Sequence, residues 1–218
     1  MSGLVMELLA GWTDDSRPPG WQGSRLASPL RAPGVQTATQ YRTIMGPPET
    51  MVAYELNDVS VVASQAWRAM DQQAPDERHP HHDSTSEPRD RRLYRLSTEF
   101  YNGPWDLQQV HAAIAVWLTV DDSDDLAAWY AQEHIPLLFR SPGWLRVRRF
   151  ELVSGGGPRW LALHDLQSRD TIDDSRASAA RDTEWRSHIM ANRTAFERRA
   201  YRLHRRIPAE MDELHAGA

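Results

Sequence analysis

Four side chains in the second half of the sequence have the types and spacing that proton-transfer chemistry needs: His134, His164, Arg148 and Arg149. A neutral imidazole takes up or delivers a proton near neutral pH, and a guanidinium holds a carboxylate or a developing enolate. We therefore take these four as the candidate catalytic residues. Each also has an ordinary structural explanation, either as a hydrogen-bonded core histidine or as one partner of a salt bridge.

His134 lies on the apolar stripe of a predicted helix. It follows Tyr130 by about one helical turn, and Glu133 is expected to turn away from the stripe. The apolar neighbours at helical spacing are Leu126, Tyr130 and Leu137. A histidine in this place is either a hydrogen-bonded core residue or a general acid/base.

The two arginines are adjacent on a predicted strand at residues 144–153. Because neighbouring side chains on a strand alternate between its faces, one of Arg148 and Arg149 must point inward. A partly buried guanidinium needs an anionic partner. That partner is either an acidic group of a substrate or a carboxylate of the chain, Glu151 or Asp165.

His164 lies on the next predicted strand, residues 160–166, and shares a face with Trp160 and Ala162. Large aromatic side chains near it either line a substrate pocket or belong to the core. The candidate substrate-binding residues are Trp129, Tyr130, Trp144, Trp160 and Trp185.

The elements that carry these residues follow the order strand, helix, strand, strand, helix, strand. The acidic run at 121–125 supplies an N-cap, and the glycines at 155–157 form a hairpin turn and not a phosphate loop. We expect strands at 107–120, 144–153, 160–166 and 195–207, and helices at 121–139 and from about 169.

The same order is found twice in the chain. Residues 91–96, Arg-Arg-Leu-Tyr-Arg-Leu, return at 198–203 as Arg-Arg-Ala-Tyr-Arg-Leu, and further matches follow in the same order. The four candidate catalytic residues have no counterparts of the same type in the first copy. We therefore expect one working site, in the second copy.

The first copy is degenerate. Its strands are expected at 5–12, 37–44, 51–56 and 93–101 and its second helix at 59–70, while Arg17-Pro-Pro-Gly interrupts the first helix. The segment 74–90, which contains His79, His81 and His82, is interpreted as a mobile loop in preference to a metal site. No metal site is predicted.

The predicted fold class is α+β. Residues 1–104 and 105–218 each form a ferredoxin-like βαββαβ repeat, and the two antiparallel sheets pack into a pseudo-twofold α+β barrel within one chain. Two such sheets are expected to pack face to face with helices outside. The chain would be a monomer by fusion of the repeats, or a homodimer.

Composition excludes several kinds of chemistry. The chain has no cysteine, and its 25 basic residues are all arginine, so thiolate nucleophiles and lysine Schiff bases are impossible. The net charge of −5 does not favour nucleic acid as a partner. No signal peptide or membrane span is apparent, so we expect a cytoplasmic protein with no membrane partner.

Three segments give a family resemblance across about 107–207: Trp129-Tyr-Ala-Gln-Glu-His-Ile-Pro, Ser141-Pro-Gly-Trp-Leu-Arg-Val-Arg-Arg-Phe and Arg159-Trp-Leu-Ala-Leu-His-Asp-Leu. Together they resemble the EthD-like proteins of the dimeric α+β barrel superfamily. The resemblance implies a cleft for an apolar small molecule. It leaves the reaction open among decarboxylases, cyclases, dehydratases, cofactor-free monooxygenases and haem proteins.

Residues and resemblance together predict a cofactor-independent tailoring enzyme acting on an aromatic or polyketide-like acid. His134 would transfer the proton, Arg148 or Arg149 would hold a carboxylate or enolate, and His164 would assist. A decarboxylase or other lyase is preferred, with a cyclase, dehydratase or cofactor-free monooxygenase as alternatives. A haem enzyme with His134 or His164 as axial ligand and a non-catalytic binding protein are rival classes.

Overall fold

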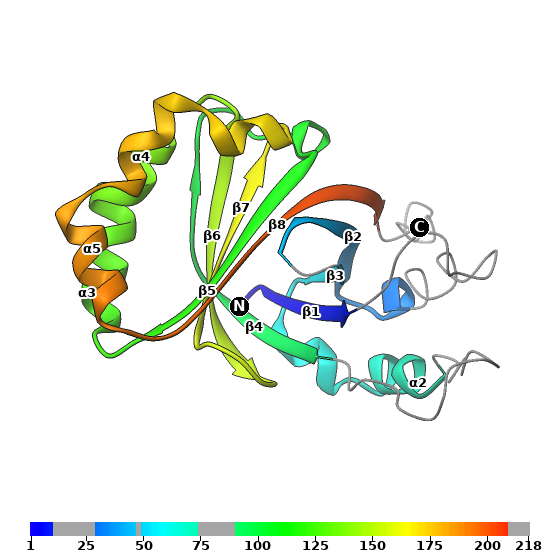
Figure 1. Ribbon diagram of the computed structural model, residues 1–218. Coiled ribbons are helices and arrows are strands. Elements are labelled where there is room, and N and C mark those ends of the chain that lie inside the picture. The colour runs from blue at the N-terminus through cyan, green and yellow to red at the C-terminus, as the bar shows by residue number, and fades with distance from the viewer. Residues whose placement is uncertain (11–28, 47–48, 74–89, 209–218) are drawn as a thin grey trace.

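Eight antiparallel strands close into a barrel in the computed structural model, which describes residues 1–10, 29–46, 49–73 and 90–208 (Figure 1). The order around the barrel is β1-β3-β2-β8-β5-β7-β6-β4. The strands are β1 Gly3–Ala10, β2 Val35–Met45, β3 Glu49–Leu56, β4 Asp90–Tyr101, β5 Ala112–Val120, β6 Trp144–Ser154, β7 Trp160–Leu166 and β8 Arg193–Pro208.

The barrel closes where strands of the two halves of the chain pair with each other. β2 pairs with β8, and β4 pairs with β6, both antiparallel. The two halves are therefore joined edge to edge, and their inward-facing residues also pack against each other in one apolar cluster inside the barrel. A mixed fold with a closed antiparallel barrel is confirmed, whereas the origin of the halves as two repeats stays a prediction.

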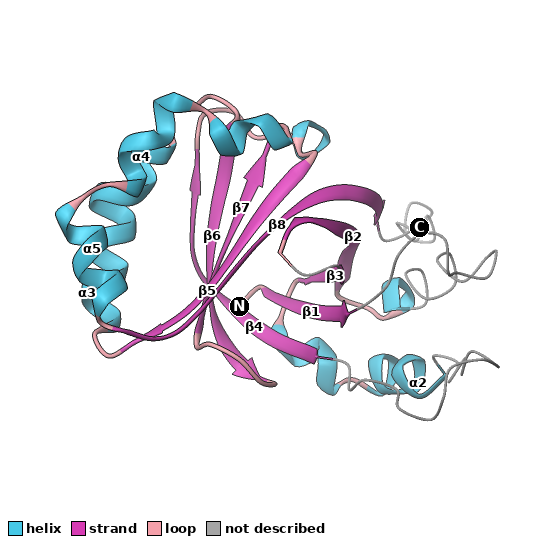
Figure 2. Ribbon diagram, in the orientation of Figure 1, coloured by secondary structure: helices cyan, strands magenta, loops and turns pink. Residues whose placement is uncertain are grey.

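Helices cover the outside of the barrel (Figure 2). α3, α4 and α5 lie together beside the strands of the second half, and α2 lies on the other side of the molecule near β4 (Figure 1). The helical elements are η2 Pro29–Arg31, η3 Val59–Ala63, α2 Gln65–Gln73, η4 Leu107–Gln109, α3 Ser123–Trp129, η5 Tyr130–His134, α4 Ile135–Leu138, η6 Arg169–Asp173, η7 Ser175–Arg181 and α5 Glu184–Ala191.

Two predicted elements of the second half are divided in the structure. The expected strand at 107–120 begins only at Ala112, because the side chain of Asp106 caps a short 3-10 turn before it. The expected helix from about 169 is two 3-10 segments followed by α5, and the side chains of Asp174 and Thr183 cap η7 and α5. The interrupted first helix and the loop at 74–89 lie outside the described residues, and Asp90 begins β4.

Three apolar clusters hold the layers together. The barrel interior contains one cluster, with Trp117 and Phe150 among its members. The layer between the second-half strands and their helices contains another, with Ile114 and Tyr130. The third covers the outer side of the first half, around Tyr54. A strand of this barrel thus has two buried faces, one in the interior and one beneath the helices.

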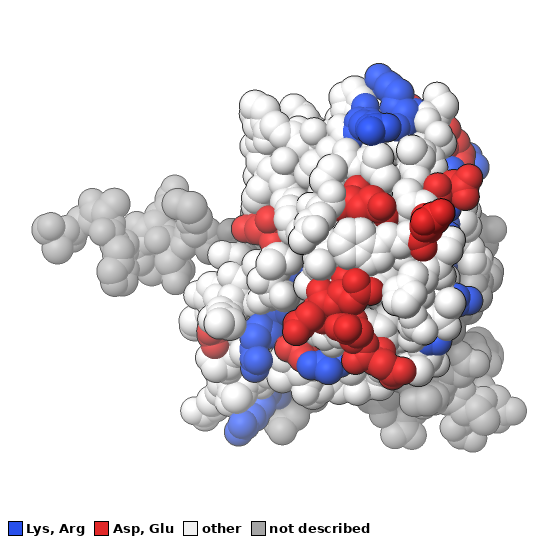
Figure 3. All heavy atoms as spheres, turned by 90° about the vertical axis from the view of Figure 1, so that its left-hand side faces the viewer, with Lys and Arg blue, Asp and Glu red and all other residues white. Residues whose placement is uncertain are grey.

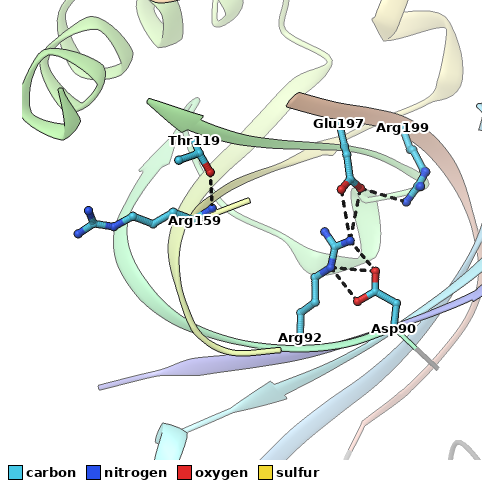
Figure 4. A network of polar contacts seen from close by, with 6 residues as sticks. All are labelled: Asp90, Arg92, Thr119, Arg159, Glu197 and Arg199. Carbon is cyan, nitrogen blue, oxygen red and sulfur yellow. Dashed lines mark hydrogen bonds and ion pairs between the residues drawn. The ribbon is translucent and has the colours of Figure 1, made fainter. Parts of the chain in front are cut away.

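Ion pairs close one end of the barrel interior (Figure 4). Arg92 of β4 donates to Asp90 at 2.9 Å and lies 3.4 Å from Glu197 of β8, which also pairs with Arg199 at 3.6 Å. Arg92 is 4% exposed, and its guanidinium lies 5.4 Å from the ring centroid of Trp117. These contacts connect the first half of the chain to the second.

The turn at 155–157 requires glycine at its first position. Gly155 has φ +104°, and a Cβ there would lie 2.3 Å from the carbonyl oxygen of Arg91, whereas a Cβ on Gly156 would meet nothing within 4 Å. We expect Gly155→Ala to lower the free energy of unfolding by about 1–3 kcal/mol and Gly156→Ala to change it by less than about 0.5 kcal/mol. Urea unfolding of both variants measures the difference, and equal losses would contradict the described turn.

Candidate functional site

The candidate residues of the second half gather between the barrel and helices α3, η5 and α4. Arg149 comes from β6, His164 from β7 and His134 from η5. Trp129, Tyr130, Trp144 and Trp160 belong to or border the same apolar cluster. The predicted site is thus brought together in one layer, with one exception, Arg148.

Arg148 points into the barrel, which corrects its assignment as a catalytic candidate. Its Nη1 donates to Glu55 of β3 at 2.7 Å, and its Nη2 lies 3.3 Å from Asp165. Asp165 also accepts from Arg146 Nε at 2.7 Å. The carboxylates of the chain neutralise Arg148, as the salt-bridge explanation predicted through Asp165, and the guanidinium is not free to hold a substrate.

This interior network lowers the pKa of the Glu55 carboxyl group. Burial would raise its pKa, but the charges of Arg148 and Arg146 lower it overall below its ordinary value. Arg148 itself is 6% exposed. The network joins β3 of the first half to β6 and β7 of the second, so it is part of the barrel's stability.

Arg149 points the other way, into the layer beneath the helices. It is 4% exposed, with its Cζ 4.8 Å from the ring centroid of Tyr130 and 5.5 Å from that of Trp160. Within the described part of the chain it makes no hydrogen bond and no ion pair. Burial lowers its pKa, against the influence of Tyr130, but a guanidinium stays charged in proteins. Arg149 is therefore a buried cation stacked between aromatic rings.

Burial and the charge of Arg149 act in opposite directions on the pKa of Tyr130. Burial raises the pKa of its phenol to about 12, although the positive charge of Arg149 opposes the shift. Tyr130 is 2% exposed. It thus stays a neutral phenol at physiological pH and does not neutralise Arg149.

His134 lies in a π-helical turn, η5, inserted between α3 and α4. Such single π turns are frequent at functional sites. Its Nδ1 is 3.2 Å from the carbonyl oxygen of Ala180, which can only accept, so Nδ1 carries the proton. The neutral ring therefore presents a lone pair at Nε2, the atom that a general base uses.

Neighbouring groups hold the His134 ring in place. It stacks on Trp129 with centroids 4.2 Å apart and planes inclined by 24°. Glu133 does not simply turn away, as expected from helical spacing, because it accepts from Trp129 Nε1 at 3.1 Å and from Thr183 Oγ1 at 2.6 Å. This contact could not be predicted from sequence spacing, because Thr183 is 50 residues away.

His164 is 2% exposed and has the opposite tautomer. Its Nδ1 lies 3.0 Å from Trp144 Nε1, and because an indole only donates, Nδ1 is the acceptor. The proton of the neutral ring is then on Nε2. His164 offers a hydrogen-bond donor, which can stabilise an oxyanion, whereas His134 offers an acceptor.

Two of the predicted aromatic residues also connect elements. Trp185 Nε1 donates to Asp125 at 2.9 Å and joins α5 to α3, and Trp160 Nε1 lies 3.3 Å from Ser123 Oγ. These bonds give both rings a structural role. Their part in substrate binding stays a prediction.

The two histidines make stability depend on pH. Burial lowers the pKa of His134 to about 3, and burial and then the charge of His134 lower the pKa of His164 well below its ordinary value. Below about pH 6.5 the unfolded chain therefore binds more protons than the folded one, so stability falls as pH falls from about 6.5. Above that pH this contribution is constant.

We expect each of the two histidines to add a slope of up to about 1.4 kcal/mol per pH unit to the free energy of unfolding below pH 6. His134→Gln keeps a donor for Ala180 but does not titrate, so it should make the slope between pH 5 and pH 7 measurably shallower. The same change at the exposed His111 is the control. A slope that His134→Gln leaves unchanged would contradict the buried neutral ring.

The outer face over this layer is acidic. Figure 3 looks onto the side covered by α3, α4 and α5, where Asp and Glu side chains gather over the centre and lower part, with basic side chains at the upper edge and at the lower left. The first turn of α3 contributes Asp124 and Asp125. Among the described residues no helix is long and apolar enough to cross a membrane, and no group of three or more His, Asp or Glu residues is arranged for a metal ion.

Comparison with solved structures identifies the fold. No family model and no curated protein sequence matches the chain. An anthrone oxidase-like protein has a similar structure, with a TM-score of 0.62, 12% identity, and coverage of 96% of this chain and 94% of that one. The chain has the dimeric α+β barrel fold.

Two further structures share this barrel fold. A monooxygenase-like protein from Listeria innocua matches with a TM-score of 0.54 and 8% identity over 94% of each chain. A chlorite dismutase variant from Candidatus Nitrospira defluvii matches with a TM-score of 0.56 and 8% identity, over 94% of this chain and 91% of that one. At such identities the likeness concerns the fold alone.

Proposed function

We propose that this protein is a small-molecule tailoring enzyme that deprotonates an aromatic, polyketide-like acid in the layer beneath α3, η5 and α4. The observation that carries the proposal is Arg149. A buried guanidinium with no carboxylate partner in the described structure is costly, and an anionic ligand between the aromatic rings would offset the cost. The EthD-like motifs around His134 and Trp144 belong to the same proposal.

The tautomers assign the roles within the site. His134 Nε2 accepts a proton from an acidic carbon or phenol of the substrate, and the electron pair left behind becomes an enolate or phenolate. Arg149 and the Nε2 proton of His164 face that negative charge and stabilise it electrostatically. Burial lowers the pKa of His134 to about 3, and a negatively charged substrate beside the ring would raise it on binding.

The fate of the anion decides the reaction. Decarboxylation is favoured when two arginines are available to hold a carboxylate. Arg148 is not available, because it forms ion pairs with Glu55 and Asp165. We therefore place cofactor-free oxygenation first: an activated methylene loses a proton, its carbon forms a bond to O2, and a carbonyl and one water result, with the substrate supplying all electrons. The anthrone oxidase-like and monooxygenase-like neighbours support this order. Decarboxylation, cyclisation and dehydration are the alternatives from the same anion.

The experiment is incubation of the purified protein with a panel of polycyclic phenols and aromatic acids, under air and under argon, followed by mass spectrometry. Oxygenation predicts consumption of O2 and one oxygen atom from labelled O2 in the product. Loss of CO2 under argon would instead establish the decarboxylase. No product from any member, with binding retained, would leave a non-catalytic binding protein as the function.

A haem enzyme is a second candidate because of one feature of His134. Its Nδ1 proton bonds to a backbone carbonyl while Nε2 is free, which is how a histidine that ligates a metal is usually oriented. His134 would hold the iron, and haem would supply redox chemistry at that atom. Titration of the protein with haemin decides this: a Soret shift that His134→Gln removes would support it.

A further inference from the structure

A second arginine, Arg198, lies on the same face of the sheet as Arg149, and this face forms one side of the proposed site. Across neighbouring strands, Arg198 of β8 is opposite Val116, Val116 is opposite Ala162, and Ala162 is opposite Arg149. Directly opposed residues on adjacent strands point to the same face of a sheet. The two arginines therefore rise from one face, three strand spacings or about 14 Å apart.

The face of the sheet between the two arginines is open to solvent at one residue, Val116. Val116 is partly exposed, although Ile114 and Leu118, on the same face of the same strand, are 2% and 1% exposed. Ala162 is the only side chain between Val116 and Arg149 in this row, and it is small. The row thus offers a flat apolar surface with a cation at each end.

Further arginines surround Arg198. Arg181 follows Ala180, whose carbonyl accepts from His134, and Arg186 lies in the first turn of α5, where its backbone N–H donates to the cap residue Thr183. Arg198 and Arg181 are exposed, and Arg186 is partly buried. Desolvation, followed by the charges of Arg181 and Arg186, lowers the pKa of Arg198, with Asp173 as the opposing charge. Like charges are therefore concentrated at this rim of the site.

Carboxylates do not neutralise this cluster. Within the described residues, none of Arg181, Arg186 and Arg198 forms an ion pair, and Arg198 donates only to the sulfur of Met45, at 3.1 Å. A thioether is a weak acceptor. Arginines that are close together and lack acidic partners form an anion-binding site.

We infer that the substrate carries two acidic groups at opposite ends of a flat aromatic body, one held by Arg149 and the other by Arg198 with Arg186 and Arg181. The inference rests on the proposed function, because it extends the same site. It names the substrate class more narrowly, as an elongated aromatic diacid in place of a monoacid.

The test compares two probes, a linear naphthalene dicarboxylate and the matching monocarboxylate, by calorimetric titration at pH 7 of the full chain. We expect the wild type to bind the diacid about tenfold more tightly or better, because each charge-assisted contact contributes that much. Arg198→Gln should abolish the advantage of the diacid and leave the monoacid unaffected. Arg202→Gln, an exposed arginine four positions along β8, is the matched control and should preserve the advantage.

The outcomes separate the inference from the function on which it rests. If Arg198→Gln keeps the full preference for the diacid while Arg149→Gln weakens both probes, the second subsite is wrong and the proposed site stands. If neither probe binds the wild type, the proposed acid-binding site itself fails. Thermal unfolding of each variant checks that the fold is intact.

Discussion

Replacing Arg149 with methionine is expected to raise the free energy of unfolding by about 1–3 kcal/mol and to abolish turnover. Arg149 is 4% exposed and has no acidic partner among the described residues, so only the rings of Tyr130 and Trp160 offset the cost of desolvating its charge. A methionine of similar length would pack between Tyr130 and Trp160 without that penalty. Urea unfolding followed by tryptophan fluorescence measures the stability, and the product assay measures the activity.

Arg159 provides the control for this change. It lies over the same indole, 5.1 Å from the centroid of Trp160, but it is half exposed and pairs with Glu151 at 2.8 Å. Arg159→Met should change stability by no more than about 1 kcal/mol, as surface pairs usually do, and should keep activity. If Arg149→Met instead loses several kcal/mol, Arg149 has a structural partner and the functional assignment is wrong.

Methionine at the preceding position, Arg148, is expected to change the free energy of unfolding in the opposite direction. Arg148→Met should lower the free energy of unfolding by about 3–5 kcal/mol, because it leaves Glu55 without its partner at 2.7 Å and removes one of the two arginines at Asp165. The measurement is again urea unfolding. A loss below about 1 kcal/mol would contradict the interior network.

A milder variant keeps this prediction testable should Arg148→Met fail to fold. Glu55→Gln removes one charge of the network, and the Glu55 side chain is 24% exposed. The free energy of unfolding should therefore fall less than in Arg148→Met. Its effect should also shrink as pH falls and the wild-type Glu55 becomes protonated. Because the folded-state pKa of Glu55 is lowered, its stabilising contribution is present above its unfolded pKa and disappears below it.

Strand alternation correctly placed Arg148 and Arg149 on opposite faces but could not tell which of them lies beneath the helices. The word inward is ambiguous in this fold, because β6 is buried on both sides, in the barrel and beneath the helices. Sequence periodicity reports burial and not the identity of the covering layer. The partner that decides the matter, Glu55, lies 93 residues away in the other half.

Other parts of the site were beyond sequence reasoning for related reasons. The pattern of the helix that carries His134 was evident, but the π turn at Tyr130–His134 changes which neighbours meet, and Glu133 turns to Trp129 and Thr183. Arg198 could not be singled out from the sequence, because it belongs to the repeated Arg-Arg-x-Tyr-Arg-Leu segment and its alignment with Arg149 depends on strand pairing through β5 and β7. The duplication did direct attention to the second half, which contains Arg149, a cation without an ion-pair partner among the described residues.

The proposed role of Arg149 is tested most directly by whether the site prefers a negatively charged ligand to a neutral one of the same shape. Calorimetric titration with a naphthalene carboxylate and with the carboxamide of the same shape isolates the contribution of the negative charge. We expect the wild type to prefer the carboxylate by about tenfold or more and Arg149→Gln to remove the preference without loss of stability. Equal binding of the two ligands by the wild type, or a preference that survives in Arg149→Gln, would contradict this role.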